Sequence, residues 1–194
     1  MQRNGEARAT RIGAERVTVE ALTGAVLECD PPFPPLPAET RGERPGLHVA
    51  PLLAHVRRDR VVGVLLVRLG GHAAGVFAGT RLVDSKVGTR PVHGRHRAGG
   101  SSQRRFERRR QGQARVALEA AADVAARVLL PHVPDLEALV PGGDRRALAE
   151  VLADPRLRPL AALPTERVLD VPDPRLDVLR STPERFRATV LRVR

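Results

Sequence analysis

A stretch from Arg97 to Gln113, with the sequence RAGGSSQRRFERRRQGQ, joins small residues directly to dense positive charge. Gly99 and Gly100 lead through two serines to Gln103, and arginines follow at once. The glutamine amide donates and accepts hydrogen bonds but does not titrate, so it cannot act as a general base. It can orient a water molecule and donate to a developing negative charge. Because glycine adopts backbone angles that other residues avoid, the sequence predicts a slim loop that presents Gln103.

The arginines of this region are the second candidate feature. Residues 90–115 contain nine arginines and one acid, Glu107, and so carry +8 of the net charge of +11. On a helix, arginines three, four or seven residues apart would form ladders that bind successive phosphates with salt-dependent affinity. A solvated face is the other interpretation of a charge run, but this concentration favours phosphate binding. The candidate RNA-binding residues are Arg95, Arg97, Arg104, Arg105, Arg108, Arg109, Arg110 and Arg115.

Composition limits the class of partner. A net charge of +11 and an isoelectric point near 11.5 indicate a polyanionic partner, either nucleic acid or an acidic membrane face. Aromatic residues make up only 2% of the chain, which argues against domains that stack several RNA bases on sheet aromatics. Cys29 is the only cysteine, so an intrachain disulfide and a cysteine zinc site are excluded.

The apolar segments are too short for a membrane protein. The longest run, 61–69, is interrupted by Arg68 and falls well below the roughly 20 residues that a spanning helix needs. The N-terminal segment has no apolar core of a secretory signal. We therefore expect a soluble cytoplasmic protein without membrane contact.

Other motifs carry less chemistry. His93 and His96 have metal-like spacing, but no further ligand is evident, so we interpret them as histidines of an RNA-contacting loop. The segment 99–102 lacks the Lys-Ser/Thr that follows the glycines of a phosphate-binding loop, which leaves nucleotide hydrolysis unsupported. The carboxylates are scattered, without the pairing of a metal nuclease. We expect neither a metal ion nor a cofactor.

The elements that would position the glutamine loop are predicted from apolar spacing. The run VVGVLLVR is typical of a buried central strand, and Gly70-Gly71 indicates a hairpin turn. The segment PPFPPLP predicts a stiff connector that serves as a structural tether or, alternatively, as a ligand for a proline-binding domain. The strands expected in this half are two around Thr23-Gly24 within 17–29, then 61–68, 72–78 and 81–87, with a short helix over 47–56.

A long helix is expected directly after the loop. Ala114, Leu118, Ala121 and Ala125 begin an apolar stripe that runs to Leu129, and Gly112 would interrupt the first turns. Gly142-Gly143-Asp144 predicts a turn and N-cap for a helix through 152. The remaining elements expected are strand 168–171, a helix after Pro174 and a closing strand 186–193. Strands, a long helix and then alternating elements predict a mixed α/β domain.

The stretch RAGGSSQRRFERRRQGQA resembles the catalytic loop and following helix of the actinobacterial Vms-like release factors, a family of peptidyl-tRNA hydrolases. That family is related to the middle domain of the eukaryotic and archaeal class I release factor, whose loop carries Gly-Gly-Gln. The resemblance runs from about Val17 to the end of the chain. Supporting segments are DPPFPPLP, VVGVLLVRLGGHAAGVFAGTRLVDSKVGTR, AADVAARVLLP, GGDRRALAEVLADPRLRPL and LDVPDPRLDVL.

The resemblance implies a fold and an organisation. The fold would be a mixed β-sheet flanked by helices, like the RNase H-like middle domain, with a protruding glutamine loop. Residues 1–194 would form one release-factor-like domain, with 1–16 flexible, 88–103 as the catalytic loop and 103–130 as a basic-to-amphipathic helix.

The resemblance also implies residue roles. Gln103 matches the catalytic glutamine, and its leader matches at Gly99, Gly100, Ser101 and Ser102. The basic helix start matches at Arg104, Arg105, Arg108, Arg109 and Arg110. The sequence departs from the family pattern at Ser101, where a bulky aromatic residue is common.

The implied activity is hydrolysis of the ester between a nascent peptide and its tRNA, in the rescue of stalled chains. The partners would be large-subunit ribosomal RNA and peptidyl-tRNA, contacted by a monomer. The alternative function is a non-enzymatic RNA-binding or ribosome-assembly factor.

Overall fold

A computed structural model describes residues 6–68, 70–89 and 102–194, and for 102–111 only the helical course of the backbone. The chain divides into two compact units, one formed by Met1–Arg58 with Glu184–Arg194 and the other by Asp59–Pro183. Each unit has its own sheet. That 1–194 acts as one release-factor-like domain stays a prediction.

The first unit is built on an antiparallel sheet with the strand order β4-β1-β2-β3-β9. The strands β2 and β3 are the pair predicted around Thr23-Gly24. The bounds are β1 (Ala7–Ile12), β2 (Val17–Ala21), β3 (Val26–Asp30), β4 (Gly42–Pro45) and β9 (Val190–Val193), with a 3-10 turn η1 (Ala38–Thr40) before β4.

Strand β1 corrects, for residues 7–12, the expectation that 1–16 is flexible. It pairs with β2 on one side and β4 on the other. Thr10 and Ile12 are buried, whereas Arg8 and Arg11 are exposed and bond Glu20 and Glu43 of the neighbouring strands. These cross-strand ion pairs let a segment with few apolar residues join the sheet.

The proline-rich connector and α1 (Ala50–Arg57) cover the inner face of this sheet. Leu36 is fully buried beside Ile12 and Leu52. The Nε2 atom of His55 donates to the carbonyl oxygens of Pro32 and Phe33, at 3.0 and 3.1 Å. The connector therefore packs within its unit, as the tether interpretation predicts.

The closing strand is shorter than predicted. Strand β9 starts at Val190, and Phe186 instead ends helix α6 (Thr182–Phe186). Pro183 favours this helix start, because proline is well suited to a first helical turn. The Phe186 ring is buried and packs edge-on against Phe33, with ring centroids 5.9 Å apart.

The second unit has a mixed sheet with the strand order β7-β6-β5-β8. The three-stranded meander is confirmed, as β5 (Val61–Arg68), β6 (Gly71–Ala78) and β7 (Arg81–Thr89). Strand β8 (Ala138–Gly143) runs parallel to β5, although its proline and glycines disfavour a strand and no strand was predicted there. The predicted strand 168–171 is wrong, since it forms only an isolated bridge between Leu169 and Gly142.

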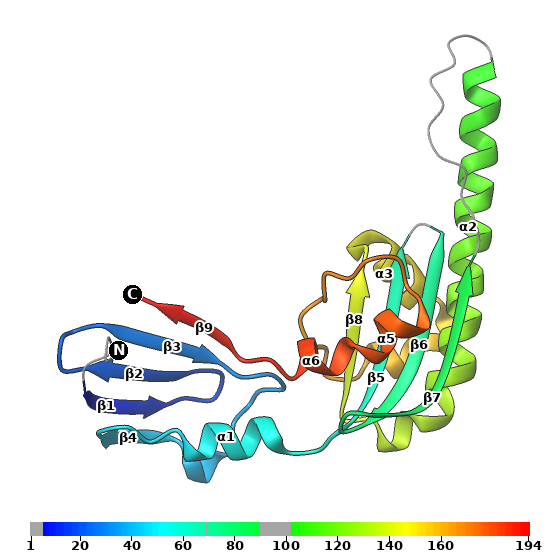
Figure 1. The fold of residues 1–194 in the computed structure, drawn as a ribbon. Helices are drawn as coiled ribbons and strands as arrows, with labels where there is room; N and C mark the ends of the chain where they lie inside the picture. Colours follow the sequence, from blue (N-terminus) through cyan, green and yellow to red (C-terminus); the bar gives the residue numbers. More distant parts are fainter. Residues whose placement is uncertain (1–5, 69, 90–101) are drawn as a thin grey trace. The chain divides into compact units, whose positions relative to one another are not determined.

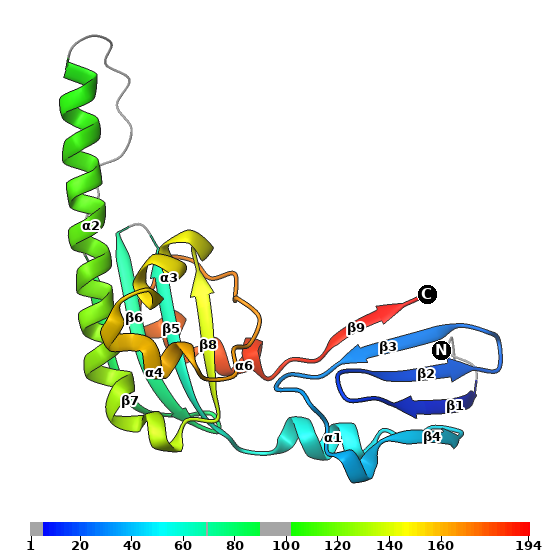
Figure 2. The ribbon, with the colours of Figure 1, turned by 180° about the vertical axis from the view of Figure 1, so that it is seen from behind.

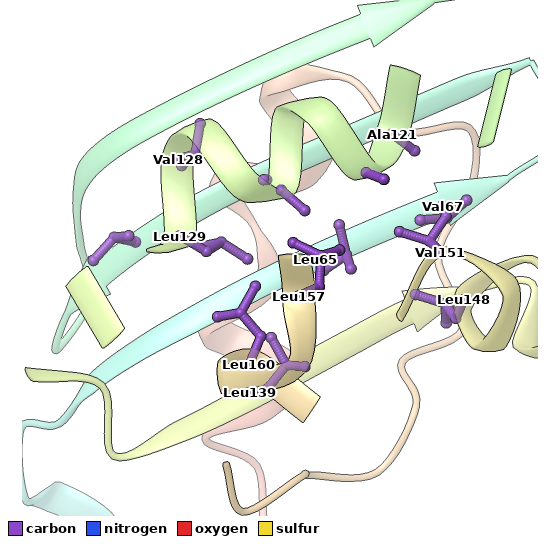
Figure 3. Close-up of a cluster of buried hydrophobic side chains, with 14 of the residues drawn as sticks. Leu65, Val67, Ala121, Val128, Leu129, Leu139, Leu148, Val151, Leu157 and Leu160 are labelled. Atoms are coloured by element: carbon purple, nitrogen blue, oxygen red, sulfur yellow. The ribbon is translucent and has the colours of Figure 1, made fainter. Parts of the chain in front are cut away.

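The predicted long helix is α2 (Ser102–Leu129), which is continuous through Gly112. Its buried stripe packs with Leu65 and Val67 of β5 and with the helices that follow β8 (Figure 3). Gly63 of β5 lies beneath this packing, and a Cβ there would lie 3.1 Å from a methyl of Leu136, which is tighter than most real Cβ contacts. The elements that complete this side of the unit are η2 (Leu130–Asp135), α3 (Arg145–Leu152), η3 (Pro155–Leu157) and α4 (Arg158–Ala161).

The opposite face of the sheet is covered by α5 (Leu176–Arg180), the helix predicted after Pro174. Figures 1 and 2 show α5 on one side of the strands, with α3 and α4 on the other. Leu179 is fully buried against Gly75 of β6. The unit is thus a mixed α/β structure with helices on both faces, and the predicted fold class is confirmed.

The N-cap of α3 gives a test of this arrangement. Asp144 Oδ1 accepts from the backbone N–H groups of Arg146 and Ala147, at 2.8 and 3.0 Å. Asp144→Ala should lower the free energy of unfolding by about 1 kcal/mol, whereas Asp144→Ser keeps an oxygen acceptor and should have a smaller effect. Urea unfolding followed by circular dichroism measures both, and equal decreases would contradict the cap.

Candidate nucleic-acid interface

Helix α2 has a buried half and a free half. Ala121, Ala125 and Leu129 are buried against the sheet, whereas Val116 is 44% exposed. Figure 1 shows the first turns of α2 extending past the ends of strands β5, β6 and β7. At 1.5 Å per residue, a helix of 28 residues is about 42 Å long. Its C-terminal half anchors the helix, and its N-terminal half projects from the unit.

An ion-pair network with exposed members connects the buried half of α2 to η3. Arg156 of η3 donates through Nη1 to Asp123 of α2 at 2.8 Å, and through Nη2 to Asp154 at 2.7 Å. Hydrogen bonds from the Arg156 side chain, and then from its backbone, hold the pKa of the Asp154 carboxyl below its ordinary value. The guanidinium therefore links α2 to the turn beneath it.

The net positive charge of the second unit comes from one region of its sequence. Outside 90–115, the unit from Asp59 to Pro183 has 12 lysines and arginines against 13 carboxylates, a net charge of −1. Residues 90–115 alone carry +8. This contrast makes the free half of α2 and the segment before it the only strongly basic sequence of the unit.

The predicted site residues fall at the free end of α2. The helix begins at Ser102, so Gln103 is its second residue, and β7 continues to Thr89, one residue beyond the predicted start of the loop at 88. Arg104, Arg105, Arg108, Arg109 and Arg110 follow within the first three turns of the helical backbone. Gly99, Gly100, Ser101, Arg95, Arg97, His93 and His96 lie outside the described residues.

Arg115 is the predicted RNA-binding residue whose side chain the structure describes. It is 79% exposed, and its Nε lies 3.5 Å from Glu119 one turn along the helix. Exposed pairs of this kind contribute little free energy. The guanidinium is therefore accessible to a phosphate group.

An open groove of about 590 Å³ lies at the foot of the free half. Its floor includes Val67 and His72 from the sheet, and its walls come from α2 and the start of α3. His72 is only 5% exposed and lies opposite Gly88 of β7 in the strand register. The lining residues are Val67, Arg68, Gly71, His72, Ala114, Arg115, Ala117, Leu118, Asp144, Arg146, Ala147 and Glu150.

The described residues contain neither a metal-binding cluster nor a helix suited to a membrane. Within 6–68, 70–89 and 102–194, no three histidine, cysteine or carboxylate side chains are grouped so that they could hold a metal ion. None of the described helices combines the length and apolar character that a membrane crossing demands.

The family of the chain follows from a comparison with family models. The model described as Actinobacteria/chloroflexi VLRF1 release factor matches residues 60–192, which is more than half of the sequence. The chain belongs to this release-factor family. The matched range includes β7, all of α2 and the residues that line the groove.

Individual relatives of this release-factor chain cover it in part. Peptide chain release factor subunit 1 of Methanopyrus kandleri is 32% identical over 96 residues, which is 50% of this chain and 23% of that protein. The crystal structure of archaeal translation termination factor aRF1 is 17% identical with a TM-score of 0.43, over 86% of this chain and 49% of that one. An archaeal protein of known structure is 17% identical with a TM-score of 0.38, over 84% and 48%. The chain spans less than half the length of each relative.

Two features of the site in this release-factor chain were not predicted from its sequence. Arg156 and Asp123 are 33 residues apart, and neither belongs to a recognisable motif. His72 and Gly88 meet only through strand register, which the meander prediction did not specify. Because the register shifts between Val76 and Phe77, equal spacing from the turn between β6 and β7 would pair His72 with Val87, so the sequence carries no signal for the pair with Gly88.

The Arg156 network predicts a pH dependence of stability. Because the pKa of Asp154 is lowered from its ordinary value of 3.8, its stabilising contribution is present above that value and is lost as pH falls through the folded pKa. Arg156→Met should lower the Tm at neutral pH, and the difference from the unaltered protein should shrink below about pH 4. Calorimetry between pH 2 and 7 measures it.

Arg158→Met is the matched control, because it removes an exposed arginine two residues further along. Its effect on the Tm should not follow the same pH profile. A difference between Arg156→Met and the unaltered protein that persists undiminished down to pH 2 would contradict the proposed role of the network.

Proposed function

We propose that this chain is a peptidyl-tRNA hydrolase of the ribosome, which frees nascent chains from stalled large-subunit complexes in the cytoplasm. The observation that carries the proposal is the position of Gln103 at the start of a projecting basic helix on an otherwise near-neutral unit. Membership of a release-factor family supports it. The partners would be large-subunit ribosomal RNA and peptidyl-tRNA, and the chain would act as a monomer without a cofactor.

The arginines would provide the attachment. Phosphates of ribosomal RNA would lie along the free half of α2, where Arg115 is accessible and the other arginines follow the helical backbone. Each phosphate contact releases counterions, so the affinity depends on salt. The near-neutral remainder of the unit would add little to this attraction, which favours docking by the helix end first.

The reaction would be an ester hydrolysis. Water attacks the ester carbonyl carbon at the 3′ end of the tRNA, the bond to the ribose oxygen breaks, and that oxygen leaves as a hydroxyl after gaining a proton. Gln103 would orient the water. Because an amide cannot accept the proton as a general base, a group of the RNA or another water must do so. Positioning supplies up to about 7–11 kcal/mol in such reactions.

The backbone at the start of α2 would make a second contribution to catalysis. The first four backbone N–H groups of a helix have no partner within it, and the helix dipole places partial positive charge there. As the second residue of α2, Gln103 contributes one of these N–H groups. It would donate to the oxyanion that forms during attack, an interaction that supplies about 3–4 kcal/mol in other hydrolases.

The alternative is a non-enzymatic RNA-binding or ribosome-assembly factor. It would use the same basic helix, and the glutamine would have no chemical role. The two functions differ in what happens to peptidyl-tRNA after binding, so variants at Gln103 distinguish them.

Gln103→Ala should abolish or strongly reduce peptide release from stalled large-subunit complexes. Binding to the subunit should stay near that of the unaltered protein, because a neutral side chain adds little to a contact dominated by arginines. Gln103→Glu should be no better, since it replaces the amide donor with a negative charge beside a developing oxyanion. Release is scored as free tRNA against peptidyl-tRNA on acidic gels.

Gln113→Ala is the matched control, because it removes the same side chain ten residues further along α2. It should release peptide at the unaltered rate. Full activity of Gln103→Ala would sink the hydrolytic mechanism and leave the RNA-binding alternative.

The arginine surface predicts a salt effect. Replacement of Arg104, Arg105, Arg108 and Arg109 by alanine should weaken subunit binding and reduce the slope of log K against log salt by about 0.7–0.9 for each phosphate that the variant no longer binds. The control set, Arg127, Arg158, Arg175 and Arg180, removes equal charge from exposed positions elsewhere in the unit. Identical slopes for the two sets would show that the α2 arginines form only a solvated face.

A further inference from the structure

His72 lies between the two elements that flank residues 90–101. On one side it faces Gly88, two residues from the start of that interval in β7. On the other side it lines the groove with Ala114 and Leu118, where α2 reaches the sheet. His72 therefore lies against the end of β7 and borders the groove at the base of the free half of α2.

The contact with Gly88 is close. A Cβ at Gly88 would lie 2.7 Å from Cε1 of the His72 ring, and closer still to Nε2. Real Cβ atoms essentially never come so near another heavy atom, so a side chain at 88 and this ring position exclude each other. Gly88 thus gives the ring a seat on the backbone of β7, and His72 is buried there, with only 5% of the residue exposed.

The position of the ring constrains the elements around it. A ring buried on a glycine has few rotamers open to it, so we expect it to fix the spacing of the elements on either side. Those elements are the end of β7 and the base of the free half of α2, which precede and follow residues 90–101 in the sequence.

We propose that His72, seated on Gly88, is a positioning residue that sets the direction in which the basic half of α2 leaves the unit. The ring holds the end of β7 at a fixed distance from α2 at Ala114–Leu118. Loss of the ring lets α2 tilt into the groove, which moves the helix start and Gln103. The consequence for catalysis rests on the proposed hydrolase function, whereas the structural consequence does not.

A distance measurement tests the structural part without any activity. Spin labels at Val83→Cys on β7 and Gly112→Cys on α2 occupy exposed positions, and a Cys29→Ala background removes the native thiol. Pulsed electron paramagnetic resonance should give a narrow distance distribution with His72 present. His72→Ala should shift or broaden it, and His72→Phe, which keeps a ring, should restore it.

An activity measurement tests the catalytic part. With saturating protein, His72→Ala should lower the rate constant of peptide release about 10- to 100-fold, since misplacement by about 1 Å costs that much in enzymes. Subunit affinity should stay near the unaltered value, because the arginines are unchanged. This separation of rate from affinity distinguishes positioning from a general disruption of structure.

A double-mutant cycle tests whether the effect of His72 on peptide release depends on its contact with Gly88. Gly88→Ala displaces the ring and should slow release on its own. In the His72→Ala background the added methyl group has space, so the double variant should be no slower than His72→Ala. Effects that simply multiply would contradict the seat on Gly88.

Two outcomes of these measurements would contradict the proposed role of His72. A His72→Ala distance distribution that superimposes on that of the unaltered protein would overturn the positioning role. A shifted distribution with unchanged release would overturn its catalytic consequence. If the unaltered protein releases no peptide, the proposed function fails, and the distance measurement alone decides the role of His72.

Discussion

The burial of one half of α2 on the mixed sheet is the constraint on which the site depends. A stripe of small residues, including Ala121 and Ala125, lets the helix approach the strands closely. Close packing of this kind gives many dispersion contacts and little freedom to move. Because the same helix is continuous to Ser102, rigidity at its base is transmitted to its free end.

The distribution of charge in the second unit also depends on the position of α2. The body of the unit is close to neutral, so the basic sequence at 90–115 dominates its electric field. A polyanionic partner would therefore be attracted to the free end of the helix rather than to the folded body. At the base, apolar packing and the Arg156 network hold α2 without competing for that partner. Anchoring and attraction are thus assigned to opposite halves of one helix.

Much of this arrangement follows from sequence. The run VVGVLLVR and its glycine turn predicted the meander, the alanine-rich stripe predicted α2, and Asp144 predicted the start of α3. Strand β1 was missed because its sheet contacts rely on ion pairs rather than on apolar alternation. Strand β8 was missed because its parallel partner lies some 75 residues earlier, and distant pairing leaves no local signal. The seat of His72 on Gly88 depends on register, which composition cannot specify. The roles of Gln103 and of the α2 arginines stay predictions.

The most direct test of the account uses the unaltered protein. Purified large subunits that carry a peptidyl-tRNA are incubated with it, and the tRNA is resolved into free and peptide-linked forms over time. The account predicts that free tRNA and intact released peptide accumulate together, at a rate that saturates with protein concentration and falls as salt weakens binding. Stable binding to these subunits with the peptidyl-tRNA left intact would contradict it.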